Sequence, residues 1–567
     1  MKLKGSDILM ECLLEQGVDT IFGYPGGTVI NLYDSIYKYG DKIKHILTAH
    51  EQGASHAADG YARSTGKVGV CIATSGPGAT NLTTGIATAF MDSSPVVFIT
   101  CNVGEAFIGK DSFQECDTVG ITMPITKCNY LVKDVNEIAS TVRAAFAMAR
   151  SGRPGPVVID ILTNISGQEA EYEKVDLDKH YESGKLATLK NRPTHNLKPH
   201  EPEGDIDKLI EMIEASEKPM VICGGGVVRG RAQAEFLEFV EKADAPVAIT
   251  IMGAGGFDGS NPLSTNMIGM HGSQASNRGI DACDLLISVG CRFNERVTLD
   301  VKHFARNAKI VHIDIDRSEI DKNVKTDHHI VGDAKRVLEI ANKKLKQQDH
   351  TPWKEYVFQF PKEQEYESGG DTLTPKQITE AIAKILPEKT IVATDVGQHQ
   401  MWAIQHLHFT YPGQLITSGG FGAMGFGLGA AIGAKVGNPD QCVCHITGDG
   451  SFRMNFAELC TEQKYDIPVI TVLFNNSALG MVRQWQTLMY DHRYSQTYMD
   501  RGPDFVKLAE AFGIMGMRCT TKIELEAALQ AALESGKSAV IECPIDIDEL
   551  VRPMVPGGRA ITNFIVD

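Results

Sequence analysis

The chain has 567 residues, of which 43% are hydrophobic and 22% are charged, and its formal net charge at pH 7 is −16. This length predicts about three or four domains, each large enough to bury a core. The acidic balance argues against nucleic acid or an anionic membrane surface as a partner, because both usually bind a basic face, and no apolar run reaches the roughly 18 residues of a membrane span. Thirteen cysteines are scattered without a C-x-x-C pair. We therefore expect no disulfide framework, no zinc site and a cytoplasmic protein.

Apolar runs alternate with helical patterns in the first third of the chain. The runs "KVGVCIATSG" (67–76), "SPVVFITCN" (94–102) and "PGPVVIDIL" (154–162) predict buried strands, and Asn81–Met91 between the first two is a predicted helix. This alternation is typical of a parallel α/β domain, which we place at residues 1–170. A polar stretch that contains prolines follows at 171–204 and is predicted to be a linker.

The middle and the last third repeat the same alternation. The middle has "KPMVICGGG" (218–226), "APVAITIMG" (245–253), "ACDLLISVGCRF" (282–293) and "AKIVHIDID" (308–316). The last third has "KTIVATDVG" (389–397), "CVCHITGDG" (442–450) and "IPVITVLFNN" (467–476). We predict a central domain at 205–342, a second linker at 343–373 and a last domain at 374–567. The fold class is therefore α/β, with three doubly wound parallel-sheet domains.

Two polar strand ends in the last third predict a metal site. Asp449 follows one strand between two glycines, and Asn476 closes the next strand after a helix predicted over Phe452–Gln463. Successive parallel strands end at the same edge of a sheet, so the two side chains can meet. One charged and one neutral oxygen suit Mg²⁺, which often bridges to a ligand's phosphates. Taken singly, an Asp turn and an Asn helix cap explain the two residues about equally well.

A candidate acid lies in "TAHEQGASHAADGYARSTG" (48–66), where Glu51 ends an apolar run and opens a helix of small residues. For an isolated Glu at a helix start, a favourable interaction with the helix dipole is the more common explanation.

The motifs together resemble one family. The Gly-Asp-Gly…Asn-Asn pattern, with 27 positions from Asp449 to Asn476, is similar to the thiamine diphosphate (ThDP) motif. The segments "FGYPGG" (22–27), "HEQGASHAADGYAR" (50–63) and "TSGPGATN" (74–81) resemble the pyrimidine-binding domain of acetohydroxyacid synthases, also called acetolactate synthases. Their diphosphate-binding domain resembles "TDVGQHQMW" (394–402) and "TSGGFGAMGFG" (417–427), and the similarity extends over essentially the whole chain.

The resemblance implies an activity and two cofactors. These transferases decarboxylate pyruvate on ThDP and transfer the two-carbon unit to a second 2-ketoacid, pyruvate or 2-ketobutyrate, in branched-chain amino-acid biosynthesis. Mg²⁺ would be held by Asp449, Asn476 and the backbone carbonyl of Ala478. The catalytic residues would be Glu51, which activates the cofactor, with Gly27 and Gln114. The other ThDP-binding residues would be Pro25, Pro77, Asn81, Val396, Gly397, Gln398, His399, Gly422, Met424, Gly448, Gly450, Ser451 and Met481.

The resemblance also implies a substrate pocket and a flavin. The segments "DSFQE" (111–115), "SVGCRFNERVT" (288–298) and "LGMVRQWQTLMYDHRYSQT" (479–497) resemble substrate-binding parts of the synthases. The substrate residues would be Phe113, Gln114, Arg296, Val482 and Trp485. A bound FAD with no redox part in the main reaction would contact Arg153, Gly224, Gly225, Gly226, Thr250, Met270, His271, Gly290, Arg292, Asp314 and Asp333.

The resemblance further implies an assembly. Glu51 of one chain would face Asp449 of another in a homodimer or homotetramer, and the family includes enzymes with a regulatory small subunit. We expect the tail "RPMVPGG" (552–558) to form part of a lid. The chain departs from the family pattern at five places: Asn102, Thr163 (the usual Lys), Met252, Asn294-Glu295 and Gly429.

Three alternatives stay open. Another ThDP-dependent decarboxylase, carboligase or acetyltransferase would share most of these motifs. A catalytically silent cofactor-binding partner protein would not need Glu51. Finally, Gly420–Gly425 matches a dinucleotide-binding G-x-G-x-x-G, but the acidic residue expected about 20 positions further on is not evident.

Overall fold

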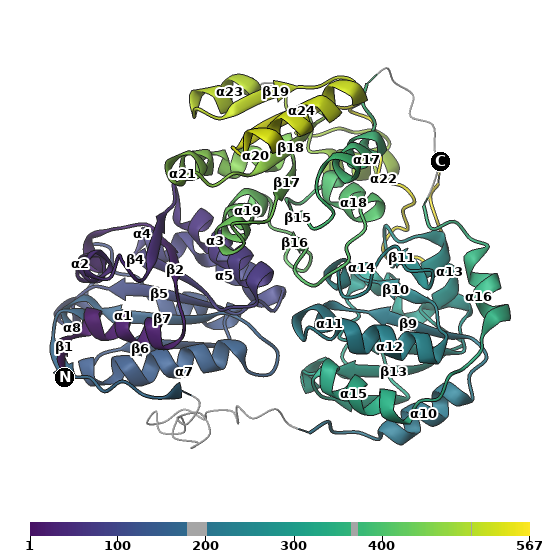
Figure 1. Cartoon of the computed structure of the whole chain (residues 1–567), viewed down its shortest axis with the longest axis horizontal. Coiled ribbons are helices and arrows are strands. Elements are labelled where there is room, and N and C mark those ends of the chain that lie inside the picture. Colours follow the sequence, from purple (N-terminus) through teal and green to yellow (C-terminus); the bar gives the residue numbers. More distant parts are fainter. Residues whose placement is uncertain (178–200, 364–371, 501, 567) are drawn as a thin grey trace.

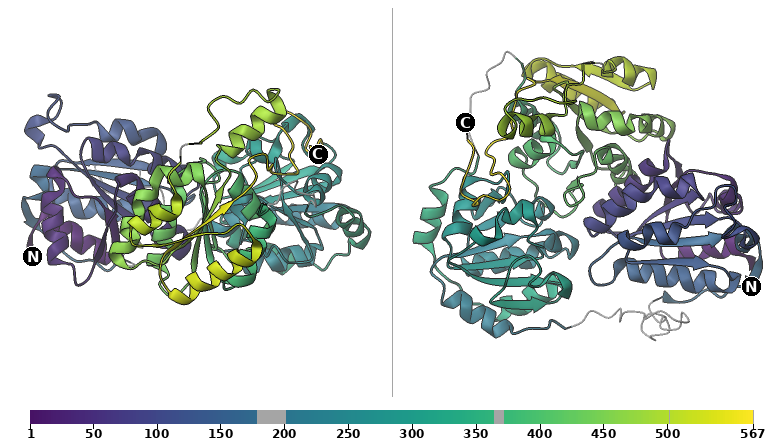
Figure 2. Two further views of the ribbon diagram at one scale, coloured as in Figure 1. Left: turned by 90° about the horizontal axis from the view of Figure 1, so that it is seen from above. Right: turned by 180° about the vertical axis from the view of Figure 1, so that it is seen from behind.

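Within the part of the chain that the structure describes, three six-stranded parallel sheets are each covered by helices, which confirms the predicted α/β class with three doubly wound parallel sheets (Figure 1). The computed structural model describes residues 1–177, 201–363, 372–500 and 502–566. Figure 2 shows the N-terminal and central domains side by side, with the C-terminal domain packed across both.

The N-terminal sheet has the order β3-β2-β4-β5-β7-β6, and a short antiparallel pair, β1 and β8, lies apart from it. Its strands are β1 (Lys2–Lys4), β2 (Thr20–Gly23), β3 (Lys44–Leu47), β4 (Gly69–Thr74), β5 (Val96–Asn102), β6 (Cys128–Val132), β7 (Val157–Leu162) and β8 (Glu169–Glu171). Its helices are α1 (Gly5–Glu15), α2 (Ile30–Lys38), α3 (Glu51–Thr65), α4 (Pro77–Asn81), α5 (Thr83–Met91), α6 (Thr118–Thr122), α7 (Ile138–Arg150) and α8 (Thr163–Ser166).

The central sheet has the order β11-β10-β9-β12-β13-β14, in which the first strand of the domain lies in the middle, as in dinucleotide-binding doubly wound sheets. Its strands are β9 (Pro219–Cys223), β10 (Val247–Ile249), β11 (Ser264–Met267), β12 (Leu285–Val289), β13 (Lys309–Asp314) and β14 (His328–Val331). Its helices are α10 (Ile206–Glu214), α11 (Gly225–Arg229), α12 (Gln233–Ala243), α13 (Gln274–Ala282), α14 (Glu295–Thr298), α15 (Ala334–Lys344) and α16 (Thr351–Phe358).

The C-terminal sheet, β16-β15-β17-β18-β20-β19, has the same strand order as the N-terminal sheet when each is counted from its own first long strand. Its strands are β15 (Ile391–Thr394), β16 (Leu415–Thr417), β17 (Val443–Gly448), β18 (Ile470–Asn475), β19 (Met515–Arg518) and β20 (Ala539–Pro544). Its helices are α17 (Pro375–Ile385), α18 (Gln398–His406), α19 (Phe426–Gly437), α20 (Asp449–Asn455), α21 (Leu459–Tyr465), α22 (Gly480–Met489), α23 (Phe505–Ala511) and α24 (Lys522–Ser535), with a 3-10 turn, η9 (Phe456–Glu458), between α20 and α21.

The strand order fixes where ligands can bind. In both terminal domains the second strand lies on one side of the first strand, and the third strand lies on its other side. The connections that follow the first and third strands therefore run in opposite directions, so a crevice opens between these two strands at their carboxyl ends. In the C-terminal domain these are β15 and β17, whose ends carry Val396 and Asp449. In the N-terminal domain they are β2 and β4, which are followed by the predicted Pro25 and Pro77.

Helices α3 and α19 join the N-terminal and C-terminal domains through contacts between their backbones. A Cβ atom added to Gly60 would lie 2.1 Å from the carbonyl oxygen of Ala430, and one added to Gly433 would lie 1.8 Å from that of Ala57. Side chains at these positions would push the two helices apart, so the glycines allow the close approach. As a result, the N-terminal end of α3, where Glu51 lies, is held against the C-terminal domain.

Of the predicted linker 343–373, residues 343–363 are more ordered than a linker, and residues 364–371 lie outside the described residues. The ordered part begins with the last turn of α15 and contains α16, whose Trp353 and Val357 are buried in the apolar cluster of the central domain. The indole Nε1 of Trp353 donates to the carbonyl oxygen of Pro219 at 2.9 Å. The polar residues around these two apolar side chains suggested a linker, whereas the buried pair makes the segment part of the domain. Most of the first predicted linker, 171–204, lies outside the described residues.

One further difference concerns the predicted helix Phe452–Gln463. The helix begins earlier, at Asp449, and is interrupted by the 3-10 turn η9. The tail packs on the central domain, because the backbone nitrogen of Val555 donates to the carbonyl oxygen of Met270 at 2.7 Å.

Among the helices of the described residues, none has both the length and the apolar character that a membrane crossing requires.

Burial of Glu462 on α21 predicts a pH-dependent stability. This side chain is 1% exposed, and burial raises its pKa to about 8. Between its unfolded pKa and this value, the folded state binds more protons than the unfolded state, so the free energy of unfolding falls as pH rises. We expect Glu462→Gln to raise Tm at pH 8 relative to the parent and to flatten the pH dependence between pH 6 and pH 8. Calorimetric scans at both pH values measure this, and equal slopes for the two proteins would contradict it.

Candidate active site

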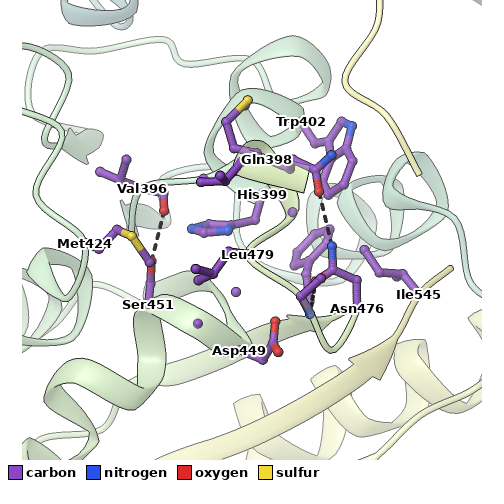
Figure 3. A pocket seen from close by; sticks show the side chains of 18 residues that line it. Val396, Gln398, His399, Trp402, Met424, Asp449, Ser451, Asn476, Leu479 and Ile545 are labelled. Atoms are coloured by element: carbon purple, nitrogen blue, oxygen red, sulfur yellow. Dashed lines mark hydrogen bonds between the residues drawn. The ribbon is translucent and has the colours of Figure 1, made fainter. Parts of the chain in front are cut away.

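A pocket lies at the crevice between β15 and β17 of the C-terminal domain (Figure 3). Its walls come from the ends of β15, β17 and β18, from the starts of α18, α20 and α22, and from the glycine-rich turn before α19. The lining residues are Val396, Gly397, Gln398, His399, Trp402, Met424, Gly448, Asp449, Gly450, Ser451, Phe474, Asn476, Ala478, Leu479, Gly480, Met481, Val482 and Ile545.

Asp395, directly before the pocket, holds the strand ends together. Its carboxylate accepts hydrogen bonds from the Thr447 hydroxyl at 2.7 Å and from the Gly427 backbone nitrogen at 2.9 Å, and His445 Nε2 lies 3.1 Å from it. The carboxylate therefore joins β15, β17 and α19, which positions Val396 and Gly448 on either side of the crevice.

Asp449 presents a buried carboxylate to this pocket. The residue is 1% exposed, and its Oδ2 has no hydrogen-bond partner among the described residues. Burial raises the pKa of this carboxyl from its usual value to about 7. A buried carboxylate without a compensating partner is unfavourable, and a cation would remove that cost.

Asn476 lies beside Asp449 at the end of β18, as the strand pattern predicts. Its Nδ2 donates to Gln398 Oε1 at 3.2 Å, and its Oδ1 accepts from the Ala478 backbone nitrogen at 3.2 Å. Gln398 is itself held, because its Nε2 donates to Gln484 Oε1 at 2.9 Å and to the Glu549 carbonyl oxygen at 2.8 Å. The amide is therefore fixed in orientation beside the orphan carboxylate.

The opposite wall offers groups for an anion. Burial lowers the pKa of His399 to about 4, so its ring is neutral at pH 7, and its Nε2 has no hydrogen-bond partner among the described residues. Ser451, at the start of α20, donates to the Val396 carbonyl oxygen at 2.9 Å. Met424 reaches the pocket from a turn in which Gly422 and Gly425 have φ of +72° and +83°, a backbone that glycine adopts without strain.

These residues fit a Mg²⁺ ion that carries a diphosphate. The carboxylate of Asp449, the amide oxygen of Asn476 and backbone carbonyls are hard oxygen ligands of the kind that Mg²⁺ prefers, and the remaining ligands of such ions usually come from phosphate and water. Among the described residues, no group of three or more His, Cys, Asp or Glu side chains is placed so that it could hold a metal ion, whereas zinc sites are usually built from such groups.

Glu51 lies outside this pocket, at the first position of α3. It is 9% exposed, and Asn81 Nδ2 on α4 donates to its Oε2 at 2.9 Å. A Cβ atom added to Gly78 would lie 3.2 Å from Glu51 Oε1, so the "SGPG" turn packs against the carboxylate. The structure thus brings together Glu51, Asn81 and the turn that contains Pro77, all predicted to bind the pyrimidine side of the cofactor.

Two more of the predicted residues, Gln114 and Gly27, belong to the same domain. Gln114 has φ of +60°, and its backbone packs against Gly76 in the same turn. A Cβ added to Gly27 would meet no atom within 4 Å, so this position is open. Thr163, in place of the usual Lys, donates to the Thr28 carbonyl oxygen at 2.9 Å, which anchors the residue after Gly27.

Within one chain, the predicted substrate residues do not converge. Phe113 is 87% exposed, Val482 is 49% exposed and the Arg296 side chain is 60% exposed. Arg296 Nη1 lies 3.2 Å from Met270 Sδ, and Trp485 on α22 packs against the apolar cluster of the central domain.

The predicted FAD residues lie at the carboxyl edge of the central sheet. Gly224–Gly226, Gly290–Arg292 and Asp333 follow β9, β12 and β14, and Asp314 is the last residue of β13. Some have protein partners: Arg153 pairs with Glu319 at 2.8 Å and Asp316 at 3.4 Å, Thr250 accepts from the Gly253 nitrogen, and Asp333 caps α15. His271 Nδ1 is buried without a partner among the described residues. The glycine-lined edge fits a dinucleotide, and Arg153 would have to exchange its partners to contact one.

Comparisons with known proteins agree with this geometry. Residues 3–121, 206–340 and 395–543 match the N-terminal TPP-binding, central and C-terminal TPP-binding domains of thiamine pyrophosphate enzymes. The chain is 43% identical to a "Probable acetolactate synthase large subunit" of Methanocaldococcus jannaschii, over 99% of this chain and 95% of that protein. It is 42% identical to the acetolactate synthase isozyme 2 large subunit of Escherichia coli K12, over 99% of both chains. The chain belongs to the acetolactate synthase large-subunit family. Its resemblance to these ThDP enzymes, predicted from motifs, is confirmed.

A solved structure supports the fold of this synthase family member. The thiamine diphosphate-dependent 4-hydroxybenzoylformate decarboxylase of Rhodococcus jostii RHA1 matches with a TM-score of 0.84 and 23% identity, over 97% of this chain and all of that chain. At this identity the match bears on the fold alone.

The pocket also contains residues that sequence reasoning missed, namely Trp402, Phe474, Leu479, Gly480 and Ile545. Gly480 could have been predicted, because a glycine just after the Asn-Asn motif indicates that another group approaches the backbone closely. A Cβ there would lie 2.0 Å from Gln398 Oε1 and 2.5 Å from Asn476 Nδ2. The apolar residues carried no such signal, because an apolar side chain within or beside a strand or a helix resembles core.

Proposed function

We propose that the protein is a ThDP-dependent acetolactate synthase, which decarboxylates pyruvate and transfers the two-carbon unit to a second 2-ketoacid, pyruvate or 2-ketobutyrate. The observation that carries this proposal is the orphan carboxylate of Asp449 beside Asn476, at the topological switch point of a chain in this family. Such a reaction would place the protein in branched-chain amino-acid synthesis.

The protein's own groups divide between binding and proton transfer. Asp449, Asn476 and the Ala478 carbonyl would hold Mg²⁺, with His399, Ser451 and the glycine backbones near the diphosphate. Glu51 would exchange a proton with the aminopyrimidine ring, held in direction by its hydrogen bond from Asn81. Thiamine diphosphate, when bound, supplies the electron sink for decarboxylation. The Gly27 backbone nitrogen and Gln114 would orient the 2-ketoacid, and Arg296 would bind the acceptor's carboxylate.

We also propose that two chains build each active site. Every residue that lines the C-terminal pocket has a number of 396 or higher, whereas Glu51 and its neighbours lie in the N-terminal domain. Large apolar side chains are exposed beside both halves: Tyr24, Ile30, Phe107 and Phe113 in one, and Phe421, Met454, Val482 and Tyr498 in the other. A second copy that brings Glu51 to the partner's pocket would cover these side chains. A homodimer is the smallest such assembly, and a homotetramer contains it.

Trp485 is proposed to select 2-ketobutyrate over pyruvate as acceptor. An indole face against one extra methylene contributes about 1 kcal/mol, which corresponds to roughly tenfold or less in selectivity. We expect Trp485→Leu to lower the ratio of 2-aceto-2-hydroxybutyrate to 2-acetolactate by about that factor in a competition assay, while pyruvate consumption continues. Trp353→Phe, on α16 and not among the residues that line the pocket, is the matched control, and an unchanged ratio in Trp485→Leu would count against the assignment.

Three further points extend the proposal. FAD would bind at the glycine-lined edge of the central sheet without a redox part in the main reaction. The relatives are named large subunits, so we propose a regulatory small subunit as partner. None of the thirteen cysteines, all of which lie in the described residues, forms a disulfide, which suits the reducing cytoplasm.

The direct test is to incubate the purified protein with pyruvate, ThDP and Mg²⁺, with and without FAD and with and without 2-ketobutyrate. We expect 2-acetolactate in every case that contains ThDP and Mg²⁺, and 2-aceto-2-hydroxybutyrate when 2-ketobutyrate is added. Release of CO₂ with aldehyde alone would indicate a different ThDP decarboxylase.

A further inference from the structure

Glu458 connects the C-terminal domain to the start of α3. It ends the 3-10 turn η9 and is 1% exposed, yet both of its carboxylate oxygens bind backbone groups of the N-terminal domain. The Ala49 nitrogen donates to Oε2 at 3.1 Å, and the His50 nitrogen donates to Oε1 at 3.1 Å. These are the two residues directly before Glu51.

The contact is tightly enclosed. The Thr461 hydroxyl donates to Glu458 Oε2 at 2.7 Å, which fixes the carboxylate from its own domain. A Cβ atom added to Gly53 would lie 1.9 Å from Glu458 Oε1, so only glycine leaves room for the carboxylate beside α3. Further along the same segment, the Tyr465 hydroxyl accepts a hydrogen bond from the Leu47 backbone nitrogen at 3.0 Å. The segment 456–465 therefore holds residues 47–50 at three backbone nitrogens.

The charge of Glu458 suits this place. The start of α3 presents backbone N–H groups and the positive end of the helix dipole, and a carboxylate is the acceptor that both favour. Burial raises the pKa of Glu458, while its hydrogen bonds with Thr461, Ala49 and His50 oppose that rise. The side chain does not line the pocket and has no role in the chemistry described above.

We propose that Glu458 is a positioning residue, which fixes the backbone of residues 49–50 and thereby the direction of the Glu51 carboxylate. This inference rests on the proposed function of Glu51. It also links two parts of the site, because Asp449 and Glu458 lie at the two ends of one short segment formed by α20 and η9.

The first test compares Glu458→Gln with Glu462→Gln, which makes the same change four residues further on at a buried carboxylate that does not bind residues 49–50. In the cofactor-free protein, we expect faster amide hydrogen exchange at Ala49 and His50 in Glu458→Gln only. In the full enzyme, a small displacement of the acid should lower kcat by about ten- to 100-fold, with KM for pyruvate and affinity for ThDP unchanged. Unchanged exchange in Glu458→Gln, or equal effects of both substitutions, would overturn the proposal.

A second variant acts from the other side of the contact. Gly53→Ala displaces the Glu458 carboxylate while it raises the helix propensity of α3, so a loss of folding is not expected. We expect the same faster exchange at Ala49 and His50 and the same fall in kcat, and parental values of both would overturn the proposal. If the parent protein forms no acetolactate, the proposed function fails, while the exchange comparison still decides whether Glu458 holds residues 49–50.

Discussion

Glu51→Gln is expected to lower acetolactate formation by about 100-fold or more, because the proton transfer to the cofactor ring requires an acid that glutamine cannot replace. The substitution keeps the shape of the side chain and an oxygen that can accept from Asn81, so the fold should tolerate it. Binding of ThDP and Mg²⁺ should persist, because Glu51 does not line the pocket of the C-terminal domain. Steady-state kinetics together with a ThDP titration measure both effects.

The matched control is Glu105→Gln, which makes the same change at an exposed residue of the same domain. It should leave turnover at the parental value. Parental turnover in Glu51→Gln would remove the acid from the mechanism, and a loss of ThDP binding in that variant would assign Glu51 to binding rather than to proton transfer.

The metal pair shows what sequence alone can predict. Asp449 and Asn476 were placed together by one topological rule, that parallel strands joined by a crossover end at the same edge of their sheet. Hydrogen bonding then explains the exact orientation of Asn476: Gln398, from a different strand end, holds its amide. The sequence predicts that these two residues meet, because the strands and their direction follow from the local sequence. The residue that orients a side chain depends instead on the tertiary structure.

The similarity of the two terminal domains could not be predicted from the sequence either, again because it lies in the tertiary structure. Their sheets share one strand order, yet a shared order leaves no short repeat of residues, because many apolar sequences form the same strand. Glu458 is similar. As a single Glu within a predicted helix it suggests an exposed face, and only the packing of η9 against residues 49–50 turns it inward.

Asp449→Asn is expected to abolish Mg²⁺-dependent binding of ThDP. Loss of an outer-shell partner typically weakens metal binding by roughly 10- to 100-fold, and loss of a charged direct ligand should weaken it by more. Trp402 lines the pocket, so quenching of its fluorescence by added ThDP and Mg²⁺ offers a direct titration. Asp440→Asn removes the same charge from an exposed position of the same domain and should titrate like the parent.

Thermal unfolding separates loss of the ligand site from loss of the fold. Without ligands, the buried carboxylate of Asp449 has an oxygen with no partner, so its neutralisation should leave Tm unchanged or raise it. With ThDP and Mg²⁺, the parent should gain stability because the ligands bind the folded state only, and Asp449→Asn should gain none. If that variant kept the parental ligand-induced rise in Tm, Asp449 could not be the residue that anchors the metal, and the C-terminal pocket would need a different assignment.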